Sequence, residues 1–184
     1  MGINGWFVAV VAVALAFGLY LSWTAGRIDR LHVRIAAAKA ALDAQLVRRA
    51  SVTLELATSG LLDPATSVLL AGAAHEAREA EPAERELAES DLTRALRAAL
   101  TEPEHLAALR DDPGGAHLLA ELGASMRRAA MARRFHNDAV RATQAVRRQR
   151  LVRYLRLAGH APMPPTFEMD DPSADGFGLE SATL

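Results

Sequence analysis

The amino-terminal segment most constrains what this chain can fold into, because residues 3–25 contain no charged side chain. A bilayer core of about 30 Å needs roughly 20 apolar residues in a helix, and this run is long enough to span it. Aromatic residues stand at both ends of the run, as amphipathic rings do at membrane interfaces. Residues 1–26 are therefore predicted to form a transmembrane anchor with interface positions at Trp6, Tyr20 and Trp23.

The flanks of this run argue against a cleaved signal peptide and predict an orientation. Only Met-Gly-Ile-Asn-Gly precedes the first tryptophan, without the basic residues that a signal peptide carries. Under the positive-inside rule, a basic flank on the other side places the N-terminus outside the cell membrane and residues 27–184 in the cytoplasm. The basic residues of that flank are Arg27, Arg30, Arg34 and Lys39.

The composition of the remaining chain predicts an all-α fold. Alanine, leucine, arginine and glutamate are abundant, alanine is the best helix former, and no run of alternating β-branched residues indicates a sheet. Cysteine is absent, which excludes a disulfide framework and thiolate chemistry. The formal net charge is -1, so bulk electrostatics give no reason to expect nucleic acid as a partner.

Apolar spacing and breaker residues divide residues 27–159 into four helical segments. The first, over 27–58, continues from the anchor and carries apolar residues at 3-4 spacing, like a coiled-coil seam with a stutter. Homo-oligomerisation through residues 28–50 is compatible with this seam. Gly60 is expected to follow the end of the helix, and Asp63 with Pro64 to begin a second helix that runs to about residue 80.

The later segments complete a bundle and a tail. A third helix is expected after Pro82 and is broken at Pro103, residues 111–115 are predicted to form a turn, and the last helix is expected over about 116–157. Four helices with short connections can close an antiparallel, four-helix-like bundle over 27–159. Prolines and acidic residues predict a disordered tail over 160–184.

The last predicted helix is strongly basic, because residues 127–156 hold ten arginines and one acidic residue, Asp138. One interpretation is a surface for anionic lipid, nucleic acid or an acidic partner; we favour neutralisation by the acidic residues of 76–91 in another helix. Aromatic residues do not interleave the arginines in the way that single-stranded nucleic acid binding requires, which argues against that partner. The densest candidate interaction patch comprises Arg147, Arg148, Arg150 and Arg153.

No residue pattern in the sequence predicts a reaction. The six histidines form no metal-protease pattern, and the chain lacks a phosphate-binding glycine loop, a nucleophile elbow and a kinase signature. We therefore expect no catalytic, cofactor-binding or metal-ligating residues, no cofactor, and a protein that is not an enzyme.

Several stretches resemble the LemA family. Residues 132–140 read Ala-Arg-Arg-Phe-His-Asn-Asp-Ala-Val, similar to the family's A-R-R-x-Y-N-x-A-V with His136 in place of the tyrosine. Residues 42–49 resemble the family helix that ends in an arginine pair, and residues 159–168 resemble its closing segment. The chain departs from the family pattern at residues 51–56, which read Ser-Val-Thr-Leu-Glu-Leu where the family has D-L-I-P-N-L. The family-motif residues are Arg48, Arg49, Arg133, Arg134, Phe135, Asn137 and Asp138.

This resemblance implies a divergent LemA-like protein, that is, a membrane-anchored helical bundle without established catalytic residues. Within the motif, Phe135, then Asp138 or Ala139, and then Ala142 share one helical face by their spacing, which favours packing over ligand binding.

Two classes of function follow from these observations. The first is a scaffold or regulatory interaction module, tethered to the bilayer and acting on another membrane protein. The alternative is a hydrolase or transferase acting on lipid or cell-envelope substrates. That alternative needs acids or histidines facing a pocket between helices, and a core of only alanine, leucine and valine would exclude it.

Overall fold

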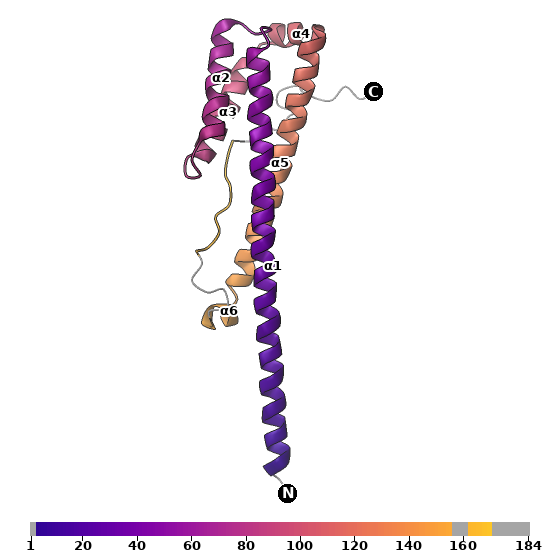
Figure 1. Ribbon diagram of the computed structural model, residues 1–184, viewed down its shortest axis with the longest axis vertical. Helices are drawn as coiled ribbons and strands as arrows, with labels where there is room; N and C mark the ends of the chain where they lie inside the picture. The colour runs from indigo at the N-terminus through magenta and orange to yellow at the C-terminus, as the bar shows by residue number, and fades with distance from the viewer. Residues whose placement is uncertain (1–2, 156–161, 171–184) are drawn as a thin grey trace. The chain divides into compact units, whose positions relative to one another are not determined.

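The computed structural model describes residues 3–155 and 162–170, and the regular secondary structure of these residues is entirely helical. The all-α prediction is confirmed. The first and last long helices are much longer than those between them, as expected. The helices in chain order are α1 (Ile3–Thr58), α2 (Pro64–Glu79), α3 (Arg85–Ala99), α4 (Pro103–Asp111), α5 (Pro113–Arg147) and α6 (Arg150–Tyr154) (Figure 1).

Helix α1 is uninterrupted and contains both the predicted anchor and the first predicted bundle segment. Within the described residues it is the one helix long and apolar enough to cross a membrane, and its most apolar window is not buried by the rest of the chain. Val13, Leu15 and Leu19 are among its exposed side chains. A contiguous apolar surface of this extent marks a membrane or partner contact rather than a surface that faces water.

The chain divides into two compact units, and both α1 and α5 contribute to each of them. Met1–Ala38 and Asn137–Thr166 form the first, which we call the anchor unit. Lys39–His136 and Phe167–Leu184 form the second, which we call the head unit.

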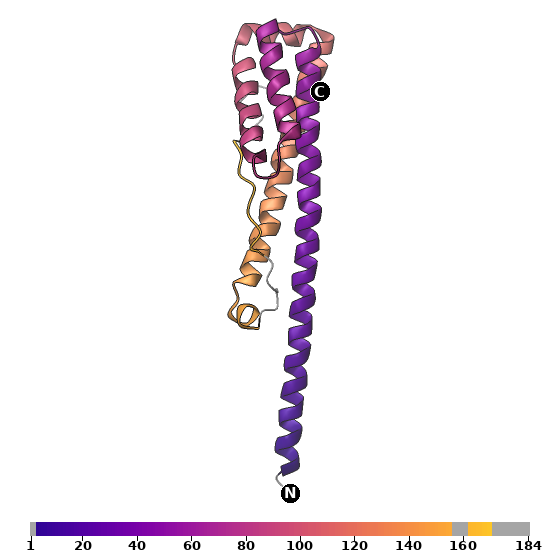
Figure 2. The ribbon, with the colours of Figure 1, turned by 60° about the vertical axis from the view of Figure 1, so that its left-hand side comes forward.

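In the head unit, the C-terminal part of α1 and the N-terminal part of α5 pack with the hairpin of α2 and α3, while α4 lies across one end (Figures 1 and 2). Leucine and alanine dominate the core because they are strong helix formers, and small alanines let helices approach closely. Burying such a set of side chains supplies the main favourable free energy of folding. Fully buried leucines of the main cluster of this core include Leu56, Leu70, Leu92, Leu96 and Leu122.

The connection between α1 and α2 forms as the sequence predicts. Gly60 has a φ of 77°, a left-handed conformation that favours glycine just after a helix. Asp63 Oδ1 accepts hydrogen bonds from the backbone N–H groups of Ala65 and Thr66, at 3.0 and 3.1 Å, and Pro64 opens the helix. Hydrogen bonds from the side chain and then the backbone of Thr66 lower the pKa of Asp63.

Helix α4 is absent from the sequence prediction, which treated Pro103 only as the end of the preceding helix. Proline lacks an N–H group, and the first turn of a helix leaves its N–H groups unsatisfied, so proline starts helices as readily as it stops them. Pro103 opens α4, and Leu106 and Leu109, three residues apart, are buried in the head core.

The predicted turn over 111–115 shrinks to one residue in the structure. Pro113 opens α5, earlier than the expected start near 116, and Asp112 alone separates it from α4. Asp112 Oδ1 accepts a hydrogen bond from Gly115 N–H at 2.8 Å. Gly115 is required by this close approach, because a Cβ atom there would collide with the backbone carbonyl of Leu109.

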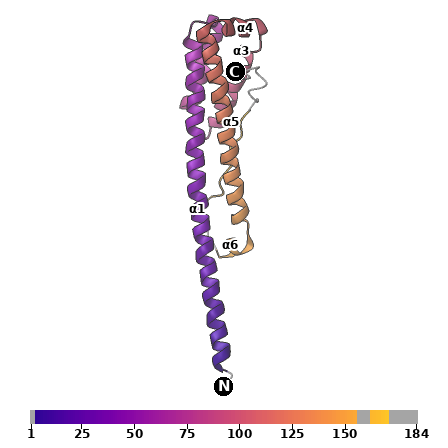
Figure 3. The ribbon, with the colours of Figure 1, turned by 90° about the vertical axis from the view of Figure 1, so that its right-hand side faces the viewer.

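In the anchor unit, the predicted single helix over 116–157 is broken at Arg148 and Gln149, which separate α5 from α6 (Figure 3). Val146 and Val152, on either side of the break, pack together against Ile28 of α1. The break therefore turns an apolar residue of α6 back onto α1.

Residues 162–170 have no regular secondary structure. In the anchor unit, Gln144 and Arg147 of α5 donate hydrogen bonds to the carbonyls of Pro164 and Pro162, at 2.9 and 2.7 Å. The rest of the predicted tail, including 171–184, lies outside the described residues.

Candidate functional site

Arg49, the second arginine of the pair at 48–49 that resembles a LemA motif, forms a buried ion pair with Glu89 of α3. Both side chains are only 1% exposed, and Arg49 NH2 donates to Glu89 Oε2. The same nitrogen also donates to the backbone carbonyl of Glu89 at 2.8 Å, and NH1 donates to Thr93 Oγ1 at 3.1 Å. The guanidinium thus joins α1 to one turn of α3 through three acceptors.

Two threonines extend this network along both helices. Thr93 Oγ1 donates to Glu89 O at 3.0 Å while it accepts from Arg49. Thr53 Oγ1 donates to Arg49 O at 2.9 Å. Both threonines are fully buried, so their hydroxyls satisfy backbone or side-chain groups that water does not reach.

Burial raises the pKa of Glu89, and the nearby charge of Arg49 only partly opposes this rise. The cost of removing the carboxylate from water therefore exceeds the attraction of its partner. Arg49 Nε and Glu89 Oε1 are also buried without a hydrogen-bond partner. The pair fixes how α1 and α3 meet, and its polar atoms are held inside the core rather than presented to a substrate.

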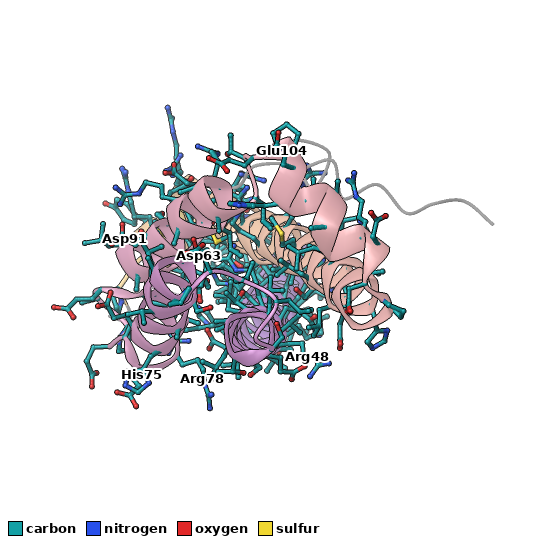
Figure 4. All side chains as sticks on the ribbon, turned by 90° about the horizontal axis from the view of Figure 1, so that it is seen from above. Arg48, Asp63, His75, Arg78, Asp91 and Glu104 are labelled. Carbon is teal, nitrogen blue, oxygen red and sulfur yellow. The ribbon has the colours of Figure 1, made fainter. Side chains whose placement is uncertain are left out.

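Arg48, the first arginine of the pair, has a different environment from its neighbour. It is exposed on the head unit (Figure 4) and forms an ion pair with Glu121 of α5, with Glu55 Oε1 at 3.9 Å. Exposed ion pairs of this kind contribute little to stability. Figure 4 also shows His75, Arg78 and Asp91 projecting outward from α2 and α3.

The second family motif, near the middle of α5, exposes its aromatic residue. Phe135 is 61% exposed, and Ala142 is exposed as well, so the expected packing of this face is wrong except at Ala139. Phe135 and Met131 instead form an exposed apolar pair four residues apart. Arg134 is exposed as well.

The polar members of this motif are divided between burial and local pairing. Asn137 is buried, Arg133 is half-buried, and Asp138 forms an ion pair with Arg141 of the same helix at 2.6 Å. Arg141 of the basic helix is thus paired with Asp138 of the same helix, three residues away, and not with an acidic residue of 76–91.

His136, which stands in place of the family's tyrosine, is buried in the head unit with 6% exposure. Its Nδ1 atom is buried without a hydrogen-bond partner. Burial lowers the pKa of His136 first, and Lys39 lowers it further, while Asp43 acts in the opposite direction. Burial and Lys39 therefore favour the neutral form of His136.

The sequence predicted ion pairs between the acidic residues of 76–91 and the last helix, but Glu89 pairs with a different helix. Its carboxylate forms an ion pair with Arg49 of α1 and not with an arginine of α5. Sequence reasoning missed this pair because it joins residues 40 positions apart. A signal was available, since Leu42, Leu46, Arg49, Thr53 and Leu56 follow 3-4 spacing and place a charge on an otherwise apolar stripe.

Residues 167–170 pack on the head unit. Phe167 and Met169 contact an apolar cluster of α1 and α5 formed by Leu42, Leu46, Ala129 and Ala132. The intervening Glu168 and Asp170 donate their backbone N–H groups to Glu86 Oε1 and Ser90 Oγ of α3, each at 3.1 Å.

The two acceptors on α3 are spaced to match this extended segment. Four residues of helix rise about 6 Å, whereas two residues of extended chain span about 6.6 Å. Alternate N–H groups therefore meet side chains one turn apart on α3, and the alternate side chains face the apolar cluster. The segment that resembles the family's closing segment, 159–168, ends within this contact. We call residues 167–170, which pack on the head unit, the strap.

The predicted interface aromatics Trp6, Tyr20 and Trp23 are exposed on α1. The ring of Trp23 lies under the guanidinium of Arg27, with 5.9 Å between the guanidinium carbon and the ring centroid. The predicted basic patch lies at the end of α5 and on α6, where Arg148, Arg150 and Arg153 are exposed.

A small cavity of about 50 Å³ in the head unit is lined by residues that include Asp63, Thr66 and His105. Among residues 3–155 and 162–170, no group of three or more His, Cys, Asp or Glu side chains is arranged to hold a metal ion.

A comparison of the chain with protein-family models finds no matching family, and a comparison with curated proteins finds no match.

Proposed function

We propose that this chain is a LemA-like membrane protein in which α1 crosses the cell membrane once. The N-terminus lies outside and residues 27–184 lie in the cytoplasm. The observation that carries the proposal is where burial begins on α1. The apolar surface before Leu21 is exposed, Thr24 is the first buried residue, and Arg27 is the first charge. The uncovered apolar length and the folded region therefore meet at the predicted membrane interface.

The cytoplasmic region is proposed to act as a scaffold or regulatory interaction module for another membrane protein, and not as an enzyme. Its buried charged groups, Arg49 and Glu89, are directed at each other. The exposed apolar pair Met131 and Phe135 offers a contact surface of the kind that aromatic and methionine side chains form at protein interfaces.

The alternative, a hydrolase or transferase acting on lipid or cell-envelope substrates, retains one supporting observation. The core is not made only of alanine, leucine and valine, since Glu89 and His136 are buried in it. Perturbed acids and histidines mark functional sites as well as structural ones. The raised pKa of Glu89 nevertheless has a structural cause, because its carboxylate is 1% exposed and the effect of this burial outweighs the opposing charge of Arg49.

Homo-oligomerisation through residues 28–50 remains a proposal with an added condition. Ile28, Leu42, Leu46 and Ala50 of the seam are already buried within the chain. A second copy therefore has to use another face of α1.

Site-specific crosslinking tests the interaction module in native membranes. A photoreactive residue replaces Phe135 in the full-length chain, and the matched control carries it at His75, which is exposed on α2. We expect a reproducible adduct with one membrane protein from position 135 and none from position 75. Adducts that are absent, or equal at both positions, contradict the proposal.

A further inference from the structure

Helix α6 lies beside the part of α1 that leaves the membrane. Val152 of α6 packs on Ile28, and both side chains are at most 2% exposed. Ile28 follows Trp23 by five residues, which corresponds to about 7.5 Å along the helix axis. The headgroup region on each side of a bilayer is roughly 5–8 Å thick. With Trp23 at the interface, the contact between α6 and α1 falls at the level of the lipid headgroups.

The side of α6 that does not face α1 exposes large apolar side chains. Tyr154 is 91% exposed and Leu151 is 47% exposed, and Leu155 just after the helix is exposed as well. An exposed tyrosine beside Leu151 of this five-residue helix and Leu155 just after it is unfavourable in water. Tyrosine with leucine suits the boundary between headgroups and acyl chains.

Basic side chains surround this apolar surface. Residues 21–38 and 141–155, all in the anchor unit, hold eight arginines, and Asp29 is their one acidic residue. Arg148, Arg150 and Arg153 are exposed next to the apolar side chains of α6, and Arg27 and Arg30 are exposed on the neighbouring turns of α1. This region of the chain holds few negative charges to balance its arginines. Anionic phospholipid supplies the complementary negative charge.

We propose that α6, with residues 148–155, is a second membrane contact that lies on the anionic surface of the leaflet from which α1 emerges. Leu151, Tyr154 and Leu155 enter the headgroup boundary, and Arg148, Arg150 and Arg153 bind lipid phosphates. The inference rests on the proposed membrane anchoring. It changes the meaning of the arginine patch, whose partner is then the bilayer that holds the chain and not a separate macromolecule.

The break between α5 and α6 gives this contact its geometry. A continuous helix would carry residues 150–155 onward along the axis of α5, whereas the break at Arg148 and Gln149 folds Val152 onto α1. Because α1 already holds the chain at the bilayer, the contact is intramolecular in effect and needs little intrinsic affinity.

Depth-dependent fluorescence in vesicles tests this contact. The chain has no cysteine, so Tyr154→Cys in the full-length protein accepts a single polarity-sensitive fluorophore. Val33→Cys is the matched control: it is exposed, apolar and in the same unit, and lies about 15 Å beyond Trp23 along α1, outside the headgroup region. The proteins are reconstituted in phosphatidylcholine or in equal parts phosphatidylcholine and phosphatidylglycerol, each with a lipid-attached quencher.

We expect strong quenching at position 154 and weak quenching at position 33 in the anionic vesicles. Each arginine near the surface contributes about fivefold to the affinity of a segment for an anionic bilayer. Arg148→Gln, Arg150→Gln and Arg153→Gln together should therefore weaken the binding of α6 to the bilayer about a hundredfold. Removing three arginines from α2 and α3 (Arg78, Arg94 and Arg97) is the charge-matched control and should leave the quenching unchanged.

Equal quenching at positions 154 and 33 overturns the proposal, and so does quenching that is indifferent both to phosphatidylglycerol and to the α6 arginines. Flotation of the unlabelled chain with vesicles at high salt measures the anchoring by itself. A chain that floats but shows no quenching at 154 refutes the α6 contact alone, whereas a chain that fails to float refutes the anchor. Circular dichroism of each variant confirms that the helices are retained.

Discussion

The buried pair of Arg49 and Glu89 makes a sharp prediction, because removing one partner and removing both should have very different effects. At an effective dielectric constant of about 20, two unit charges 4 Å apart attract by about 4 kcal/mol. The penalty for removing each ion from water is several kcal/mol, and the raised pKa of Glu89 shows that this penalty exceeds the attraction. The pair is thus costly to break and contributes little net stability.

Glu89→Leu leaves a guanidinium that is 1% exposed and cannot lose its proton, so we expect a loss of about 3–5 kcal/mol at pH values where Glu89 is ionised in the parent chain. Arg49→Met leaves a carboxylate that escapes its penalty by binding a proton. Its folded-state pKa then lies still further above the unfolded value near 4.5, so stability is retained at low pH and lost as pH rises through the folded pKa. The cost of Arg49→Met should therefore be smaller at pH 5 than at pH 8.

The double variant Arg49→Met, Glu89→Leu should be at least about 3 kcal/mol more stable than the sum of the single losses predicts. Thermal unfolding of the full-length chain in mild detergent, followed by circular dichroism, gives the four corners of this cycle. Single losses below about 1 kcal/mol, or a double loss equal to the sum of the singles, would refute the reasoning.

Three further predictions concern other contacts of the head unit. Gly115→Ala should destabilise the head unit by about 1–3 kcal/mol in thermal unfolding, because the new Cβ meets the Leu109 carbonyl. Gly72→Ala, with open space around it on α2, should stabilise the head unit by about 0.5–1 kcal/mol. Equal effects of the two substitutions would contradict the close approach at Gly115. Burial lowers the folded pKa of His136 below its unfolded value near 6.5, so the unfolded state binds more protons and stability should fall as pH falls from 7.5 towards the folded pKa. His136→Gln should flatten that part of the profile, and a slope that persists in the variant would assign it to other groups. Ser90→Cys with Asp170→Cys should form an intrachain disulfide on mild oxidation, detectable by gel mobility, because Ser90 Oγ lies 3.1 Å from Asp170 N. The control pair, Glu104→Cys with Asp170→Cys, should not form one. Equal crosslinking of the two pairs would argue against the strap.

Local signals in the sequence predicted the features that depend on a few neighbouring residues. Asp63, Pro64 and Gly60 set the connection between α1 and α2 because capping and a left-handed glycine are decided within one turn. The charge-free run from residue 3 to residue 25 predicted the apolar part of α1, because length and composition alone decide whether a helix can span a membrane.

Features that depend on tertiary contacts were missed or misassigned. Pro103 and Pro113 fit both a helix end and a helix start, and only the burial of Leu106 and Leu109 decides for α4. Phe135 was expected to pack, but His136, Ala139 and Val140 take the buried face of α5. The strap joins residues 80 or more positions apart, which no local pattern specifies.

Labelling of single cysteines in intact cells tests the membrane topology on which the proposed function depends. Gly2→Cys and His75→Cys are introduced separately into the cysteine-free full-length chain and treated with a maleimide that does not cross membranes. A chain that spans the membrane through α1, with its head unit in the cytoplasm, is labelled at position 2 in intact cells and at position 75 only after the cells are opened. Labelling of position 75 in intact cells, or a chain that has lost its first 25 residues, would contradict the account.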